Sequence, residues 1–199
     1  MPDRPANQRA IYRWITEHTP QGGRVLDIGC GDGALLAQLA AERGARGTGI
    51  ELSEDLVAKA VGRGLSVHHG DAEEGMDHYS DGSFDLLIMS LAIQEMHLPL
   101  QMIREAFRVA RQLLVVFPNF AYWQARWQLG VQGRAPRTTS FPHHPFESPN
   151  RHFFSVADWE DLCADEGWRR VDRAFIRSGR TVTLLPNLRA EVALYLMED

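Results

Sequence analysis

The sequence predicts an α/β fold: a doubly wound, mostly parallel sheet with helices on both faces. Short apolar segments alternate with amphipathic ones between residues 24 and 117, which is the pattern of strands joined by crossover helices. A turn with three glycines at 29–33 separates the first strand from the first crossover helix. At 199 residues the chain is most simply one domain, 1–199, and is long enough to bury a substantial core.

The composition argues against several classes of protein. A net charge of −5 disfavours general affinity for nucleic acid or acidic membranes, so neither is expected as a partner. The two cysteines, Cys30 and Cys163, fall in different predicted elements, so no disulfide framework is expected. No apolar run approaches the ~18 residues of a membrane span. Because Met1–Pro5 lacks the pattern of a signal peptide, a cytoplasmic protein is expected.

The first elements follow from local signals. A helix is predicted over residues 6–18, where Ile11 and Ile15 recur at helical spacing. The first strand and the glycine turn come next. The following helix is predicted to begin at Ala34 and to end at Gly44, a residue type favoured where helices stop.

The chain then continues the same alternation. Further strands are predicted at 46–51, 66–71, 83–90 and 112–117. Ser53 is expected to cap the helix between the first two of these strands, and Pro99 to begin the helix before the last. The first of these two helices has an apolar face, which comprises Leu56, Val57, Ala60 and Val61.

Residues 119–154 form an inserted segment after the fifth strand, in which the alternation lapses. The segment is rich in aromatic residues and arginine, a composition that favours an ordered surface in contact with a partner. Ser155 is expected to cap the last helix and Gly167 to end it. Residues 169–176 and 188–197 alternate apolar and polar side chains, which predicts a closing antiparallel pair.

The glycine turn fits two nucleotide-type ligands. The spacing Gly29-x-Gly31-x-x-Ala34, with Glu51 about 20 residues later, satisfies the dinucleotide fingerprint. The same turn fits Gly-x-Gly-x-Gly with an acid, Asp27, two positions before the first glycine. A carboxylate there would repel a pyrophosphate but would suit S-adenosylmethionine (SAM), which carries an ammonium and a sulfonium. We therefore expect SAM or S-adenosylhomocysteine (SAH); a tight turn without a ligand is the remaining alternative.

Three successive predicted strands end in an acid, namely Asp27, Glu51 and Asp71. Ligands of open α/β sheets bind at the carboxyl ends of the strands, so all three are expected to line one crevice. Glu51 can accept from both ribose hydroxyls, and Asp71 from the exocyclic amine of adenine. The residues expected to bind the cofactor are Asp27, Gly29, Cys30, Gly31, Gly33, Glu51, Leu52, Asp71, Ala72 and Ser90.

Spacing alone identifies no catalytic residue. The segment Ser90–Ile93 after the fourth strand lacks the Pro-Pro-aromatic motif common in methyltransferases that act on amino groups of bases or glutamine. No nucleophile elbow is present. A metal site is not expected at His143, His144 and His152, because no acid or cysteine stands at ligand spacing.

These motifs resemble those of class I SAM-dependent methyltransferases. The general match rests on residues 25–33, Glu51, Gly70–Asp71 and Ser83–Asp85. More narrowly, the chain is similar to the methionine biosynthesis protein MetW family. The narrower match rests on Phe117–Phe120, Tyr122–Trp123, Gly133–Pro136, Ser148–Phe153, Asp158–Cys163 and Asn187–Glu191.

The resemblance implies a seven-stranded sheet flanked by helices, with the last strand antiparallel. It also implies a role in methionine biosynthesis, at the step where homoserine is O-acylated, with homoserine O-acetyltransferase as the partner. Two functions follow as hypotheses. In one, the crevice senses SAM and segment 119–154 docks on the acyltransferase. In the other, the protein is an active SAM-dependent methyltransferase that acts on a small molecule or a protein.

Overall fold

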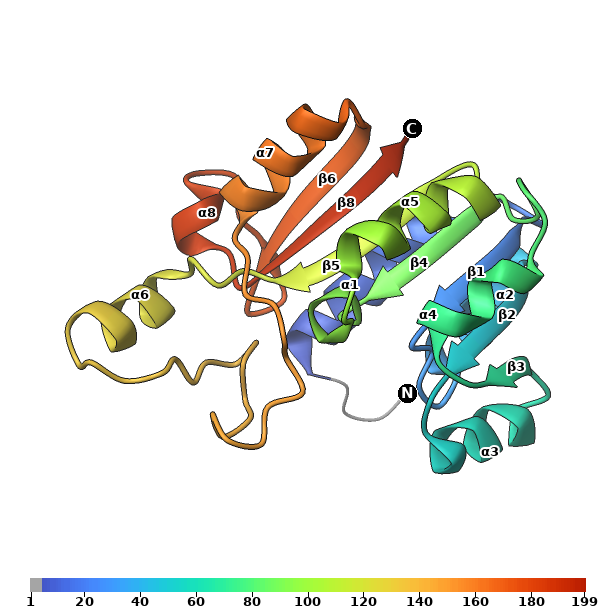
Figure 1. Ribbon diagram of the computed structural model, residues 1–199, viewed down its shortest axis with the longest axis horizontal. Helices are drawn as coiled ribbons and strands as arrows, with labels where there is room; N and C mark the ends of the chain where they lie inside the picture. The colour runs from blue at the N-terminus through green and yellow to red at the C-terminus, as the bar shows by residue number, and fades with distance from the viewer. Residues whose placement is uncertain (1–4) are drawn as a thin grey trace.

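The computed structural model describes residues 5–199. The expectation about a signal peptide rests on Met1–Pro5, and all of that segment except Pro5 lies outside the described residues. The described chain forms one eight-stranded sheet with helices on both sides (Figure 1). The strands are β1 (Arg24–Ile28), β2 (Arg46–Glu51), β3 (Ser66–His69), β4 (Leu86–Ser90), β5 (Leu113–Pro118), β6 (Arg169–Arg177), β7 (Arg180–Thr181) and β8 (Val192–Glu198). The helices are α1 (Ala6–His18), α2 (Ala34–Arg43), α3 (Glu54–Gly62), α4 (Ala72–Gly75), α5 (Pro99–Val109), α6 (Trp123–Gly130), α7 (Val156–Glu166) and α8 (Pro186–Arg189), with short 3-10 helices at Met76–His78 and Ile93–Glu95. Within residues 5–199, none of the helices has the length and apolar character needed to cross a bilayer.

The sheet has the order β3-β2-β1-β4-β5-β8-β6-β7. Strands β1 to β5 run parallel, and β8 lies antiparallel between β5 and β6. The predicted fold class and the antiparallel last strand are confirmed. The structure adds an eighth strand, β7, to the seven that the resemblance implies. This strand forms because the chain reverses at Ser178 and Gly179, both with positive φ, and returns along the end of β6.

Alternate residues of the buried strands pack on opposite faces of the sheet. On β4, Leu87 and Met89 join a core formed with α5 and α7, whereas Leu86 and Ile88 join a core formed with α1 and α2. Because β4 is covered on both faces, its sequence is a continuous apolar run. On β1 the same alternation places Asp27, which pairs with Ile88, on the α1/α2 face.

The ends of α1, α2 and α7 follow the sequence signals. The helix predicted over 6–18 is confirmed as α1. Gly44 and Gly167 end α2 and α7 in the left-handed conformation that glycine adopts without strain. Ser155 caps α7, because its hydroxyl accepts from the Asp158 N–H while the Asp158 carboxylate accepts from the Ser155 N–H.

Several predicted strand bounds differ from those observed. β3 ends two residues before Asp71, which turns the chain to cap α4. β4 begins at Leu86, and just before it Phe84 forms an isolated bridge with Ala110, while the Asp85 side chain accepts from the backbone N–H of Arg24 at 2.8 Å. β8 begins at Val192, after α8. Its residues are buried rather than alternating, because β8 lies inside the sheet between β5 and β6.

Helix α3 buries less than its sequence predicts. Of the expected apolar face only Ala60 is buried, and Val61 is 54% exposed. Ser53 occupies the N-cap position, but its side chain accepts no capping hydrogen bond. The helix lies at the outer edge of the sheet beside β3 (Figure 1), so few neighbouring elements cover it.

The inserted segment 119–154 contains a helix, α6, that the sequence pattern does not reveal. Only Ala125 of this helix is buried, so no apolar stripe marks the helical period. The buried side chain of Asn119 anchors the start of the segment by donating to the carbonyl oxygens of Asn187 and Ala190 at 3.0 and 2.9 Å. In Figure 1, α6 and the loop after it project away from the sheet.

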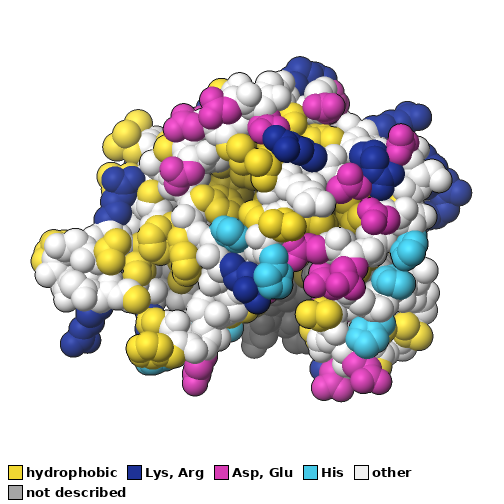
Figure 2. Space-filling model, viewed as in Figure 1, with side chains coloured by type: hydrophobic (Ala, Val, Ile, Leu, Met, Phe, Trp, Pro, Cys, Tyr) yellow, Lys and Arg dark blue, Asp and Glu magenta, His cyan; other side chains and the backbone are white. Residues whose placement is uncertain are grey.

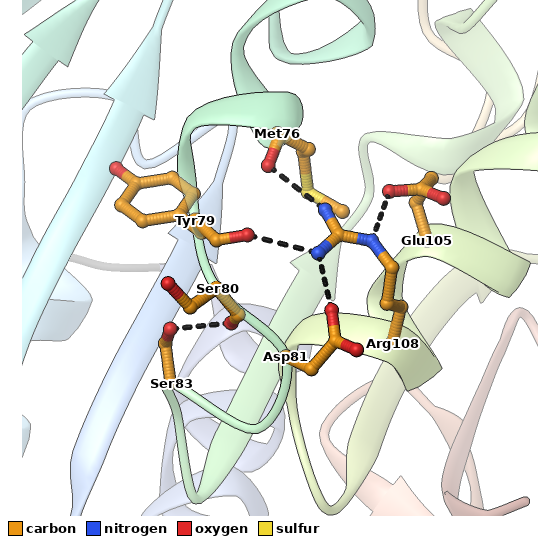
Figure 3. Close-up of polar contacts among 7 residues, drawn as sticks. All are labelled: Met76, Tyr79, Ser80, Asp81, Ser83, Glu105 and Arg108. Atoms are coloured by element: carbon orange, nitrogen blue, oxygen red, sulfur yellow. Dashed lines mark hydrogen bonds and ion pairs between the residues drawn. The ribbon is translucent and has the colours of Figure 1, made fainter.

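Arg108 on α5 holds the chain between α4 and β4 in place (Figure 3). Its guanidinium donates to the carbonyl oxygens of Met76 and Tyr79 at 3.2 and 2.9 Å. It also donates to the carboxylates of Asp81 and Glu105, each at 2.8 Å. One cation therefore joins α5 to the segment that follows α4, and α4 forms part of the cleft described next.

Candidate functional site

A cleft of about 550 Å³ opens at the carboxyl ends of β1, β2 and β4. Its walls come from the glycine turn after β1, from Glu51 at the end of β2 and Leu52 after it, from Asp71–Glu73 at α4, and from residues 91–92 and 95–97 after β4. Acidic and histidine side chains gather around α4 on this side of the molecule (Figure 2). Open α/β sheets bind ligands at this edge, and the volume is that of a small-molecule site.

The glycine turn leaves open space at Gly31. Gly29, Gly31 and Gly33 all have positive φ, between 58° and 74°, which side chains rarely allow. At Gly31, which lines the cleft, no atom lies within 4 Å of the place that a Cβ would take. At Gly33 a Cβ would lie 2.3 Å from the side chain of Leu65. Gly33 therefore serves close packing, whereas Gly31 gives a ligand access to the backbone.

Glu51 links β2 to the glycine turn. One carboxylate oxygen accepts from the backbone N–H of Gly31 at 2.8 Å, and the other accepts from that of Ser53 at 2.9 Å. A carboxylate oxygen has two lone pairs, so each oxygen retains one acceptor position. Glu51 therefore fixes the turn and still offers two acceptor positions at the cleft, which is what a ribose diol requires.

The other end of the cleft is built on α4. Asp71 caps this helix, because its Oδ1 accepts from the Glu73 N–H at 2.9 Å. The Glu73 carboxylate accepts from the backbone N–H groups of His97 and Leu98, at 3.0 and 2.6 Å, and contacts the His97 ring at 3.0 Å. Partial burial alone would raise the pKa of Glu73, but these hydrogen bonds outweigh it and lower the pKa. They tie α4 to the chain after β4.

Asp27 lies behind the glycine turn and not in the cleft. Its side chain is 2% exposed and takes no part in the cleft walls, so the expectation that all three strand-end acids line one crevice is wrong for Asp27. The cause is the strand pleat, which places Asp27 on the α1/α2 face of β1. Burial, and secondarily the charge of Glu51, raise the pKa of Asp27 to about 8.

The structure brings six of the expected cofactor-binding residues together. Those that line the cleft are Gly29, Gly31, Glu51, Leu52, Asp71 and Ala72. Those that do not are Asp27, Cys30, Gly33 and Ser90. Cys30 is buried with its sulfur against Gly49. Ser90 ends β4, and the next residue, Leu91, lines the cleft in its place.

Sequence reasoning missed the far wall of the cleft. This wall comprises Glu73, Glu95, Met96, His97, Pro149 and Arg151. Glu73 stands two residues after Asp71, the acid expected at the end of the third strand, and this spacing is a signal that could have found it. Arg151 comes from the inserted segment, where its N–H and that of His152 donate to the carbonyl oxygen of Gln94 at 2.8 and 3.0 Å. These two hydrogen bonds join distant parts of the chain, and no local sequence pattern predicts them.

The histidines of the inserted segment do not converge. His143 lines a second cavity beside the cleft, and His152 lines an apolar hollow next to Trp159. No group of three or more His, Cys, Asp or Glu side chains within residues 5–199 is arranged to hold a metal ion.

Comparison with known proteins identifies the family. The family model for the methionine biosynthesis protein MetW matches residues 9–197. The chain belongs to the MetW family. A relative of this MetW-family chain from Rhodopirellula baltica, described as a bifunctional methionine biosynthesis protein MetXA/MetW, is 32% identical over 157 residues, or 74% of this chain and 25% of the relative. A ubiquinone biosynthesis O-methyltransferase from Aromatoleum aromaticum is 41% identical over 81 residues, or 37% of this chain. The MetW-family chain thus spans 25% and 34% of the length of these two curated relatives.

Solved structures share the fold of this MetW-family chain. An S-adenosylmethionine dependent methyltransferase from Mesorhizobium loti matches with a TM-score of 0.69 and 20% identity, covering 96% of this chain and 98% of that one. The [4+2]-cyclase SpnF matches with a TM-score of 0.67 and 20% identity, covering 95% of this chain and 80% of that one. The fold is therefore that of class I methyltransferases. Because a cyclase has it as well, the fold alone does not establish methyl transfer.

Proposed function

We propose that this MetW-family protein binds SAM or SAH in the cleft. The observation that carries the proposal is the Glu51 carboxylate, which faces the cleft with two acceptor positions beside the open backbone of Gly31. In that arrangement Glu51 accepts from the ribose hydroxyls. Asp71 Oδ2, which has no protein donor in the described part of the chain, accepts from the exocyclic amine of adenine. The acceptors Glu51 and Asp71 suit the donor groups of SAM, and the cleft volume of about 550 Å³ suits a small-molecule ligand.

Asp27 contributes to this site from behind the turn. With a pKa of about 8 its carboxyl is mostly protonated at neutral pH. A cation at the methionine end of the cleft would favour the ionised form and lower that pKa. Cys30 and Gly33 shape the turn, so they act by positioning the backbone and not by direct contact.

We further infer that the protein works with homoserine O-acetyltransferase at the O-acylation of homoserine. The support is the Rhodopirellula baltica relative, whose name joins MetXA and MetW in one chain. MetXA is the homoserine acetyltransferase part of that name. Segment 119–154 offers the docking surface, because Trp123, Trp127 and Phe146 are 41%, 54% and 93% exposed. Figure 2 shows apolar side chains over the projecting part of the molecule. The segment carries four arginines and one acid, so a partner face that is both apolar and acidic would fit it.

Co-elution of the purified protein with the acyltransferase tests this partnership. We expect a complex at micromolar concentration and low salt, and a change in SAM affinity when the acyltransferase is present, because coupling between sites is reciprocal. Trp127→Ala should weaken the complex. Val61→Ala, which shortens an equally exposed side chain on α3, should not. Separate elution of the wild-type proteins would overturn the partnership and leave the proposal of SAM binding standing.

An active SAM-dependent methyltransferase is the second candidate. The observation that favours it is a second cavity of about 340 Å³, which shares Leu91 and Glu95 with the cleft and could hold a methyl acceptor. Labelled SAM incubated with the protein and lysate fractions tests this function. A labelled small molecule or protein would support it. SAM binding without any labelled product would leave the accessory role.

A further inference from the structure

The second cavity lies at the carboxyl ends of β4 and β5. Leu91 and Glu95 belong to its walls and to those of the cofactor cleft. Helix α1 contributes Gln8 and Ile11, and the inserted segment contributes residues between 139 and 143. Three distant parts of the chain thus enclose a space of about 340 Å³, within the range of small-molecule sites.

Two buried polar atoms in the walls of this cavity have no hydrogen-bond partner within residues 5–199: Gln94 Oε1 and Ser140 Oγ. Gln94 is only 4% exposed, and its amide nitrogen donates to the Leu91 carbonyl at 2.6 Å. Since a carbonyl oxygen only accepts, the nitrogen must face Leu91 and the amide oxygen remains without a donor. Buried polar atoms are rarely left unpaired. Gln94 Oε1 therefore calls for a ligand that donates a hydrogen bond, whereas the Ser140 hydroxyl can either accept one or donate one.

Leu91 is held in a strained conformation between the two cavities. Its φ is +61°, which is uncommon for a residue other than glycine. The Leu91 N–H donates to the Val116 carbonyl at 2.9 Å, and its own carbonyl accepts from Gln94. Strain that the surroundings enforce in this way is concentrated at ligand-binding sites.

The charge of the cavity walls indicates the class of ligand. Glu95 supplies the carboxylate, and among the described residues no lysine or arginine lines this cavity. Partial burial raises the pKa of Glu95; His143 opposes that shift and the charge of Glu51 reinforces it. An anionic ligand would meet the Glu95 carboxylate without a Lys or Arg to balance it. A cation would be paired by Glu95.

We propose that the second cavity binds a small alkylamine in its ammonium form, with the nitrogen at Glu95 and the alkyl chain toward Ile11 and Val192. An ammonium group has three donors and no acceptor, which matches the carboxylate of Glu95 and the unpaired oxygens of Gln94 and Ser140. The inference rests on the proposed function for one point, that the amine lies beside a bound cofactor.

Titration monitored by NMR with three probes of one shape tests this inference. The probes are butylamine, 1-butanol and butyrate, which differ in charge at one end. We expect butylamine to bind at least tenfold more tightly than the other two and to shift the side-chain amide resonances of Gln94. Equal binding of all three probes, or no saturable binding of butylamine in the millimolar range, would overturn the inference.

Variants test whether butylamine binds in the second cavity. Glu95→Gln keeps the shape of the side chain and should weaken butylamine at least tenfold. Ser140→Ala should weaken it severalfold. Glu147→Gln, which removes an acid of the inserted segment outside the cavity walls, should change nothing. Butylamine binding that is unaffected by Glu95→Gln would overturn the assignment.

A parallel titration with SAH separates this inference from the proposed function. Butylamine binding in a protein that does not bind SAH would support the amine site and overturn the cofactor proposal. SAH binding in a protein that does not bind butylamine would support the cofactor proposal and overturn the amine site.

Discussion

The carboxylate of Glu51 accepts a 2.8 Å hydrogen bond from the backbone N–H of Gly31. This bond joins the end of β2 to the turn after β1, and both residues line the cleft. The acid that we expect to hold the ribose therefore also sets the shape of the turn beside it. Loss of the side chain should affect ligand binding in two ways, through a missing acceptor and through a loosened turn.

Glu51→Ala should weaken SAH binding roughly tenfold to a hundredfold, since a hydrogen bond to a charged group is worth about 1.5–3 kcal/mol. Calorimetric titration measures the change. Glu54→Ala removes an exposed acid three residues later, outside the cleft walls, and should leave the affinity unchanged. Equal affinity of the wild type and Glu51→Ala would mean that the ligand binds elsewhere.

Gly31→Ala should abolish most SAH binding at a modest cost in stability. The added methyl group would meet no protein atom within 4 Å, but it would occupy space at the cleft. Gly64→Ala is the matched control, because Gly64 also has positive φ and open space around it and takes no part in the cleft. Both variants should lose about 1 kcal/mol of unfolding free energy. Equal SAH affinity in the two variants would contradict a ligand at Gly31.

Asp27 should make the stability of the protein fall as the pH rises. Its pKa is raised from 3.8 to about 8 in the folded state, so between these values the folded state holds a proton that the unfolded state has released. The unfolding free energy should therefore decrease across this range, by up to about 1.4 kcal/mol per pH unit from this group. Asp27→Asn does not titrate and should remove that slope in urea denaturation. If the unfolding free energies of the wild type and Asp27→Asn change with pH in parallel, the Asp27 carboxyl has an ordinary pKa and this prediction is wrong.

Arg108→Met should destabilise the protein by about 1–3 kcal/mol, because Met76 and Tyr79 would lose a charged donor to their carbonyl oxygens. Urea denaturation measures the loss. Arg104→Met is the control on the same helix, since the ion pair of Arg104 with Glu166 is exposed and such pairs contribute little. A loss no larger than that of Arg104→Met would show that Arg108 does not hold this segment.

Local patterns predicted the sheet and part of the site. The buried strands are apolar runs, and parallel strands end at one edge, which is why Glu51 and Asp71 both reach the cleft. Asp27 ends a predicted strand in the same way, but side-chain direction alternates along a strand. Counting that alternation from Val25, whose side chain packs in the α1/α2 core, would have placed Asp27 behind the turn.

The remainder of the site depends on contacts between distant segments. Glu95 follows β4 and Arg151 belongs to the inserted segment, yet both line one wall. The backbone bonds from Arg151 and His152 to the Gln94 carbonyl bring them together, and no periodicity encodes such contacts. Helix α6 was missed for a related reason, because an exposed helix does not need an apolar stripe.

Calorimetric titration of SAM into the purified protein tests the central claim most directly. We predict one saturable SAM site per chain, from which SAH displaces SAM and at which Glu51→Ala weakens binding. No heat of binding from SAM or SAH up to millimolar concentration, with or without homoserine O-acetyltransferase, would contradict it.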